Sequence, residues 1–79
     1  MADEDPTYDD LRAELDRLDA ELVEIDRDVR QVRDSLADGG PMDAEDRASA
    51  LSQIEELEQV RDRLSRRRET VRAELGSAG

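Results

Sequence analysis

The chain has 79 residues, of which 44% are charged and 35% hydrophobic, and its formal net charge is −11. This length allows one small domain with a thin core. The negative charge argues against polyanionic partners, so we expect no direct binding to nucleic acid or to acidic membranes. It favours a basic protein surface as partner.

The sequence contains no Cys or His, and all twelve basic residues are Arg. Without cysteine there is no disulfide framework and no thiolate zinc site, which favours a cytoplasmic location. No apolar run reaches the length of a signal-peptide core or a membrane span. The commonest general bases, thiol nucleophiles and Schiff-base amines are missing as well. We therefore expect no catalysis, no cofactor and no metal site.

A first helix is expected at 7–38, after an acidic stretch at 1–6 that we expect to be disordered. Thr7 with Asp10 three residues later predicts a capping pair at the start of this helix. The apolar residues are spaced alternately by four and three positions, which is the heptad seam of a coiled coil. They are Leu11, Leu15, Leu18, Leu22, Ile25, Val29, Val32 and Leu36.

A turn containing two glycines and a proline is expected at 39–42. A second helix is expected at 43–75, with Asp43 as its N-cap. Gly76 predicts the end of this helix, and residues 76–79 are expected to be disordered. The seam residues of the second helix are Ala50, Ile54, Leu57, Leu64, Val71 and Leu75, with Arg47, Arg61 and Arg68 at the seam positions between them.

The short turn makes the two helices antiparallel. Setting Leu18 opposite Leu64 aligns both seams, and it brings the acidic first half of the first helix next to the Arg-rich second half of the other. Arg side chains of the second helix can then cover leucine with their stems while their heads reach acids such as Asp19 or Glu14. The predicted fold class is all-α, an antiparallel two-helix coiled-coil hairpin.

A two-helix hairpin buries a single layer of side chains, and scaffolds of this size need a disulfide, a bound metal or a binding partner to be stable. Since neither a metal nor a disulfide is available, we expect a homodimer that forms a four-helix bundle. Four side chains at or beyond the edge of the seam are expected to form the association surface: Leu51, Val60, Leu75 and Val23.

The beginning of the second helix, "DAEDRA", has the pattern Asp-x-x-Asp-x-Ala at Asp43, Asp46 and Ala48. This pattern resembles the coiled-coil tip of the DksA/TraR transcription factors, and its layout is similar to that of the Gre cleavage factors. The resemblance implies a hairpin that enters the secondary channel of RNA polymerase, with Glu45 among the tip residues. The Cys-rich zinc module of the first family and the second globular domain of the other have no counterpart here. N-capping explains the same acids without any partner.

A second resemblance covers "LRAELDRLDAELV", at 11–23, which looks like the first helix of the all-helical chorismate mutases. The second active-site Arg of that family falls on Val29, and its loop Lys and third helix have no counterpart. The resemblance therefore implies at most a degenerate member of the chorismate-mutase family. A heptad helix with a charged surface would have the same sequence pattern at 11–23. The matching residues are Arg12, Leu15, Asp16, Leu18 and Asp19.

The basic cluster of the chain is Arg66, Arg67 and Arg68, which suits a phosphate or nucleotide. Ser65 and Arg68 also have the S-x-x-R spacing of the helical anti-sigma factors that bind cyclic di-GMP. The other motif positions hold different residues, and pairing with the acidic first helix also explains the cluster.

These patterns predict a small acidic coiled-coil module that binds protein and has no catalysis of its own. An RNA polymerase regulator acting through its tip, a degenerate chorismate-mutase-like protein and a cyclic-dinucleotide-responsive anti-sigma-like protein are the alternatives.

Overall fold

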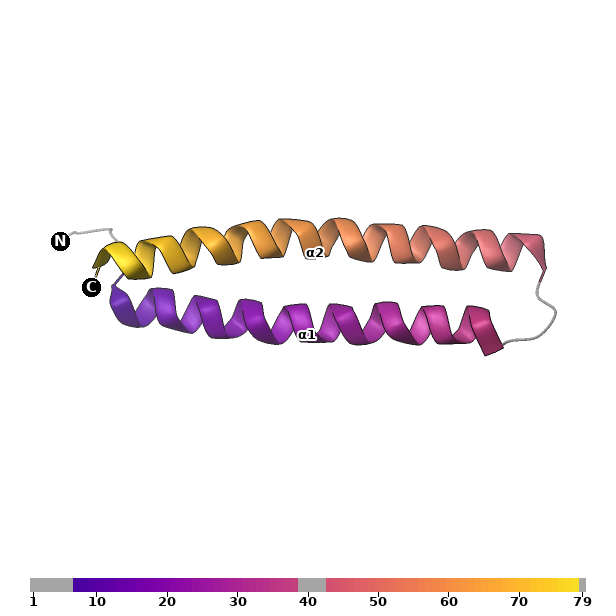
Figure 1. Ribbon diagram of the computed structural model, residues 1–79, viewed down its shortest axis with the longest axis horizontal. Coiled ribbons are helices and arrows are strands. Elements are labelled where there is room, and N and C mark those ends of the chain that lie inside the picture. Colours follow the sequence, from indigo (N-terminus) through magenta and orange to yellow (C-terminus); the bar gives the residue numbers. More distant parts are fainter. Residues whose placement is uncertain (1–6, 39–42, 79) are drawn as a thin grey trace.

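The computed structural model describes residues 7–38 and 43–78, which form two α-helices. Helix α1 spans Tyr8–Asp38 and helix α2 spans Ala44–Ala78. The helices lie antiparallel and side by side along their length, in a rod with extents of 60 × 18 × 17 Å (Figure 1). The predicted all-α helical hairpin is therefore confirmed.

The start of α1 is closed by a reciprocal pair of hydrogen bonds. The backbone N–H of Asp10 donates to Oγ1 of Thr7 at 3.1 Å, and the N–H of Thr7 donates to the Asp10 carboxylate at 3.4 Å. The carbonyl of Thr7 accepts the first helical bond from Leu11 at 3.0 Å. This geometry confirms the predicted capping pair, with an aspartate in the place that Glu or Gln usually takes in a capping box.

The seam of α1 forms most of the core, because its apolar residues recur on one face of the helix. Leu64 of α2 lies at the junction of two apolar clusters and contacts both. The first cluster comprises Leu11, Leu15, Leu18 and Val71, with Leu64 and Leu75 packed against it. The second comprises Ile25, Val29 and Ile54, with Val32, Leu36, Leu57, Val60 and Leu64 packed against it.

This packing agrees with the predicted register. Leu18 shares a cluster with Leu64, and the pair Ile25 and Leu57 shares the other. Val71, which the register places opposite Leu11, is completely buried. The seam of α2 is the weaker of the two, because Arg side chains occupy several of its core positions.

The end of α2 differs from the prediction. We expected the helix to stop before Gly76 and the last residues to be disordered, but the helix continues to Ala78. Glycine has a lower helix propensity than alanine and destabilises a helix by about 1 kcal/mol relative to it. This difference is too small to end a helix at an exposed site. The expected disordered arm at 1–6, the turn at 39–42 and Gly79 lie outside the described residues.

Neither described helix combines the length and the apolar character needed to cross a membrane.

Candidate functional site

The predicted tip residues lie together at the start of α2, at the end of the rod away from the described ends Thr7 and Ala78 (Figure 1). The carbonyl of Asp43 accepts a hydrogen bond from the N–H of Arg47 at 3.0 Å, which places Asp43 at the N-cap position. The four tip residues, Asp43, Glu45, Asp46 and Ala48, are all exposed. The tip is therefore accessible, and Asp43 also occupies the position expected of a helix cap.

Acidic side chains are frequent around the tip, yet they do not form a metal site in the part of the chain that the structure describes. Among residues 7–38 and 43–78, no group of three acidic side chains is close enough together to hold a metal ion. The tip offers negative charge to a partner, without a preformed cation cage of its own.

The basic cluster is divided by the packing of the hairpin. Arg67 donates two hydrogen bonds to Glu14 on α1, from Nε at 2.7 Å and from Nη2 at 2.9 Å. Arg68 donates from Nε to Asp19. Arg66 is exposed, and its carbonyl accepts a hydrogen bond from Oγ1 of Thr70. Two of the three guanidinium groups, those of Arg67 and Arg68, are thus engaged with acids of α1.

The bond from Arg67 has an electrostatic consequence. A guanidinium that donates to a carboxylate stabilises its charged form. The hydrogen bond from Arg67 therefore lowers the pKa of Glu14 below its ordinary value of 4.5. The hydrogen bond that Arg68 donates to Asp19 likewise raises the pKa of Arg68 above its ordinary value.

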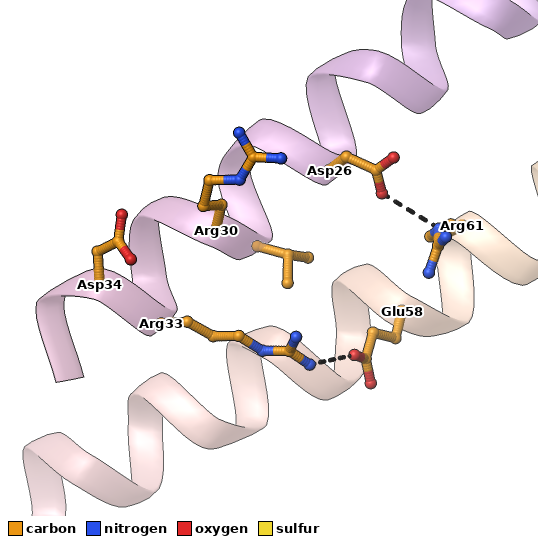
Figure 2. A pocket seen from close by; sticks show the side chains of 7 residues that line it. Asp26, Arg30, Arg33, Asp34, Glu58 and Arg61 are labelled. Carbon is orange, nitrogen blue, oxygen red and sulfur yellow. Dashed lines mark hydrogen bonds and ion pairs between the residues drawn. The ribbon is translucent and has the colours of Figure 1, made fainter. Parts of the chain in front are cut away.

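A second group of ion pairs lies nearer the tip, on the side of the rod drawn in Figure 2. Arg33 Nη2 lies 2.7 Å from Glu58 Oε2, and Arg61 Nε lies 3.2 Å from Asp26 Oδ1. Both pairs join α1 to α2 across a shallow polar pocket, and their side chains are about half exposed. The full lining is Asp26, Val29, Arg30, Arg33, Asp34, Glu58 and Arg61.

This pocket was not predicted from the sequence. The register contained the signal, because residues on the same flank of two antiparallel seams face each other across the hairpin. With Leu18 and Leu64 at equivalent seam positions, Arg33 and Glu58 fall on one flank and Glu14 and Arg67 on the other.

The structure does not bring the predicted association surface together. Leu51 is 52% exposed, whereas Val60 and Leu75 are half-buried against the core. Val60 follows Leu51 by nine positions, which at 100° per residue places the two on opposite sides of α2. Val23, on α1, is 58% exposed.

Val60 belongs instead to a groove on the other side of the rod, near the middle of its length. We call it the side groove. Three aliphatic and two acidic side chains line it: Ile25, Val60, Leu64, Glu21 and Glu24. An apolar groove that remains open in the hairpin is available for contact with another molecule.

The positions of the chorismate-mutase resemblance take heptad roles in the hairpin. Leu15 and Leu18 are buried in the core. Arg12 is exposed on α1, and its Nε atom lies 3.9 Å from Oδ1 of Asp16, one turn later. Val29, at the position of the second active-site Arg of that family, is buried in the second apolar cluster.

Charge is distributed unequally along the rod. We divide the described residues at the level of Val60. The tip half (23–38 and 43–59) holds eleven acids and four Arg, a net charge of −7. The base half (7–22 and 60–78) holds nine acids and eight Arg, a net charge of −1.

These features define an antiparallel coiled-coil hairpin with exposed acids at one end and an open apolar groove at mid-length. No protein-family model, curated protein or solved structure matches this chain.

Proposed function

We propose that the protein is a non-catalytic interaction module that self-associates as a homodimer and presents its acidic tip half to a basic protein surface. The observation that carries the proposal is the segregation of charge. Almost all the net charge of the described residues lies on the tip half, where exposed acids are not balanced by Arg. Complementary potentials of this kind guide association and select partners. A cytoplasmic location is part of the proposal, supported by the absence of cysteine from the sequence.

Binding to a fluorescent polylysine peptide at modest salt tests the charge-based contact. Asp43→Asn with Asp46→Asn removes two charges from the tip, and Asp9→Asn with Asp62→Asn removes two exposed charges from the base half as a matched control. We expect the tip pair to weaken binding severalfold and the control pair to have a smaller effect. Equal losses for the two pairs would show that only total charge matters and would contradict a tip-directed contact.

A second candidate is an RNA polymerase regulator that acts through the tip. It is favoured by the exposure of Asp43 and Asp46 at the end of a rod 60 Å long, because a narrow negative tip suits a channel that leads to metal ions. Purified polymerase provides the test. The wild-type protein should alter transcription or transcript cleavage, and the Asp43→Asn, Asp46→Asn variant should still bind polymerase without this effect. A wild-type protein that neither binds polymerase nor changes its activity would exclude this candidate.

A further inference from the structure

The side groove has charged neighbours on α2 that have no partner within the hairpin. Glu56, Val60 and Arg63 are spaced i, i+4 and i+7, so they lie along one face of α2. Glu56 and Arg63 are exposed, and no ion pair joins either of them to another described residue. No residue three or four positions from Glu56 is basic, and none at those distances from Arg63 is acidic.

The order of these three residues is self-complementary. An acid lies four residues before Val60 and a base lies three residues after it. If two copies of α2 pack antiparallel about a two-fold axis close to Val60, Glu56 of each copy faces Arg63 of the other. The axis also brings the two Val60 side chains together over the apolar groove.

Helix α1 repeats this arrangement on the same side of the rod. Arg17 lies four residues before Glu21, and Glu24 lies three residues after it. Glu21 and Glu24 line the side groove with Val60, so the same axis brings Arg17 of one copy near Glu24 of the other. Like Val60, Glu21 faces its own copy across this axis, and Arg17, one turn away, offsets the repulsion between the two Glu21 carboxylates.

The charge of the whole rod favours the same orientation. An antiparallel dimer places the tip half of each copy, at −7, beside the base half of the other, at −1. A parallel dimer would place the two tip halves together, which is strongly repulsive. One side of a rod with these dimensions offers on the order of 1,000 Å², comparable with the ~800 Å² per partner of a standard interface.

We infer that the side groove is covered by a second copy of this chain, packed antiparallel, with α2 against α2 and the two-fold axis close to Val60. This inference rests on the self-association in the proposed function and specifies its surface and orientation. It assigns Glu56 and Arg63 as the charge pair that sets the register between the two copies.

Charge reversal tests the register. Sedimentation equilibrium should show a dimer for the wild-type protein. Glu56→Arg and Arg63→Glu should each raise the dissociation constant by about tenfold or more, equivalent to about 1.4 kcal/mol, because each replaces two attractive contacts by repulsive ones. The double variant restores opposite charges between the copies and should return close to the wild-type value. Glu55→Arg, the same change one residue earlier and about 100° further round α2, is the matched control and should have little effect.

Each result decides one part of the inference. A wild-type protein that stays monomeric at about 100 μM, far above the micromolar affinities of ordinary complexes, would overturn self-association itself. A dimer that is insensitive to both single variants, or that the double variant does not restore, would overturn this interface and leave self-association standing. Far-UV circular dichroism of every variant shows whether the helices are intact, so that unfolding is not mistaken for dissociation.

A disulfide test checks the position of the axis independently. Because the sequence contains no cysteine, Val60→Cys introduces the one thiol of the chain. A residue beside a two-fold axis faces its own copy, so mild oxidation should cross-link this variant as a dimer. Val23→Cys, at an exposed site away from the groove, is the control and should cross-link much less. Equal cross-linking of the two variants would contradict an axis close to Val60.

Discussion

At the scale of single residues, the ion pairs between the helices differ in geometry. Arg67 holds Glu14 with two hydrogen bonds, whereas the contact between Arg61 and Asp26 is a single one at 3.2 Å between half-exposed groups. Exposed single pairs contribute little to stability, while a bidentate pair has a fixed geometry. Glu14 is also the less exposed partner of its pair. We therefore expect the Arg67 pair to be the one with a measurable effect on pH-dependent stability.

The first prediction concerns this pair. The pKa of Glu14 is lowered in the folded state, so its contribution to stability is present above its unfolded pKa, near 4.5, and is lost as the pH falls through the folded value. Glu14→Gln should therefore reduce the fall in the free energy of unfolding as pH decreases below about 4.5. Arg67→Gln should have the same effect, because it removes the same bond. Urea unfolding at several pH values measures this, and identical pH dependence in wild type and both variants would contradict it.

A second prediction concerns Gly76, which lies inside the last turns of α2. A Cβ atom at this position would meet no other atom within 4 Å. Gly76→Ala should raise the free energy of unfolding by about 0.4–1 kcal/mol, because alanine loses less backbone entropy in a helix. Ala73→Gly, one turn earlier and also exposed, should lower it by a similar amount. Destabilisation by Gly76→Ala in thermal unfolding would show that the helix does not persist at this position in solution.

At the scale of the helices, α1 and α2 contribute unequally to the core. Helix α1 has an unbroken apolar seam and holds five buried residues. Helix α2 has charged residues at several seam positions, and only Ile54 and Val71 of its described residues are buried. Contacts between the two seams should therefore depend strongly on the few large residues that α2 supplies, Leu64 above all, because it contacts both clusters.

A third prediction tests this packing. Leu18 is 3% exposed, so Leu18→Ala should cost about 2–4 kcal/mol. Leu64→Ala should cost less, because this side chain is only half-buried. The two changes should be non-additive, since the residues share one cluster. Val23→Ala is the exposed control and should change stability by less than about 0.5 kcal/mol. Strict additivity in a double-mutant cycle would mean that the two residues do not touch.

At the scale of the whole molecule, the hairpin is a thin rod whose two long sides differ. One side carries the polar pocket with the ion pairs of Arg33 and Arg61, and the other carries the side groove together with the pair between Arg67 and Glu14. A single layer of apolar side chains leaves such a groove exposed, since a second layer has to come from another chain. The tip residues Asp43, Glu45, Asp46 and Ala48 lie at the end of the rod, away from the side groove at mid-length, so self-association and binding of a basic partner at the tip are compatible.

A fourth prediction separates these two surfaces. The tip variant Asp43→Asn, Asp46→Asn should keep the dimeric mass of the wild type, because Asn caps helices about as well as Asp and neither residue lies in the side groove. The register variant Glu56→Arg should weaken the dimer, while its binding of polylysine falls no more than that of Glu55→Arg, which changes charge equally. Light scattering and the peptide assay measure the two effects. Loss of the dimer in the tip variant would mean that the tip itself forms part of the interface.

The sequence by itself determined the helices, their N-terminal caps and their register. Heptad spacing is local, and the seams of Leu18 and Leu64 align in essentially one way once the turn is short. The same register explains why Arg68 meets Asp19. The sequence could not determine which flanking residues remain uncovered, because exposure depends on the rotation of each helix about its own axis. Helical spacing already puts Leu51 and Val60 on opposite sides of α2, but only the packed hairpin left Val60 in an open groove. The end of α2 was also beyond the sequence, since a glycine disfavours a helix by about 1 kcal/mol without forbidding it.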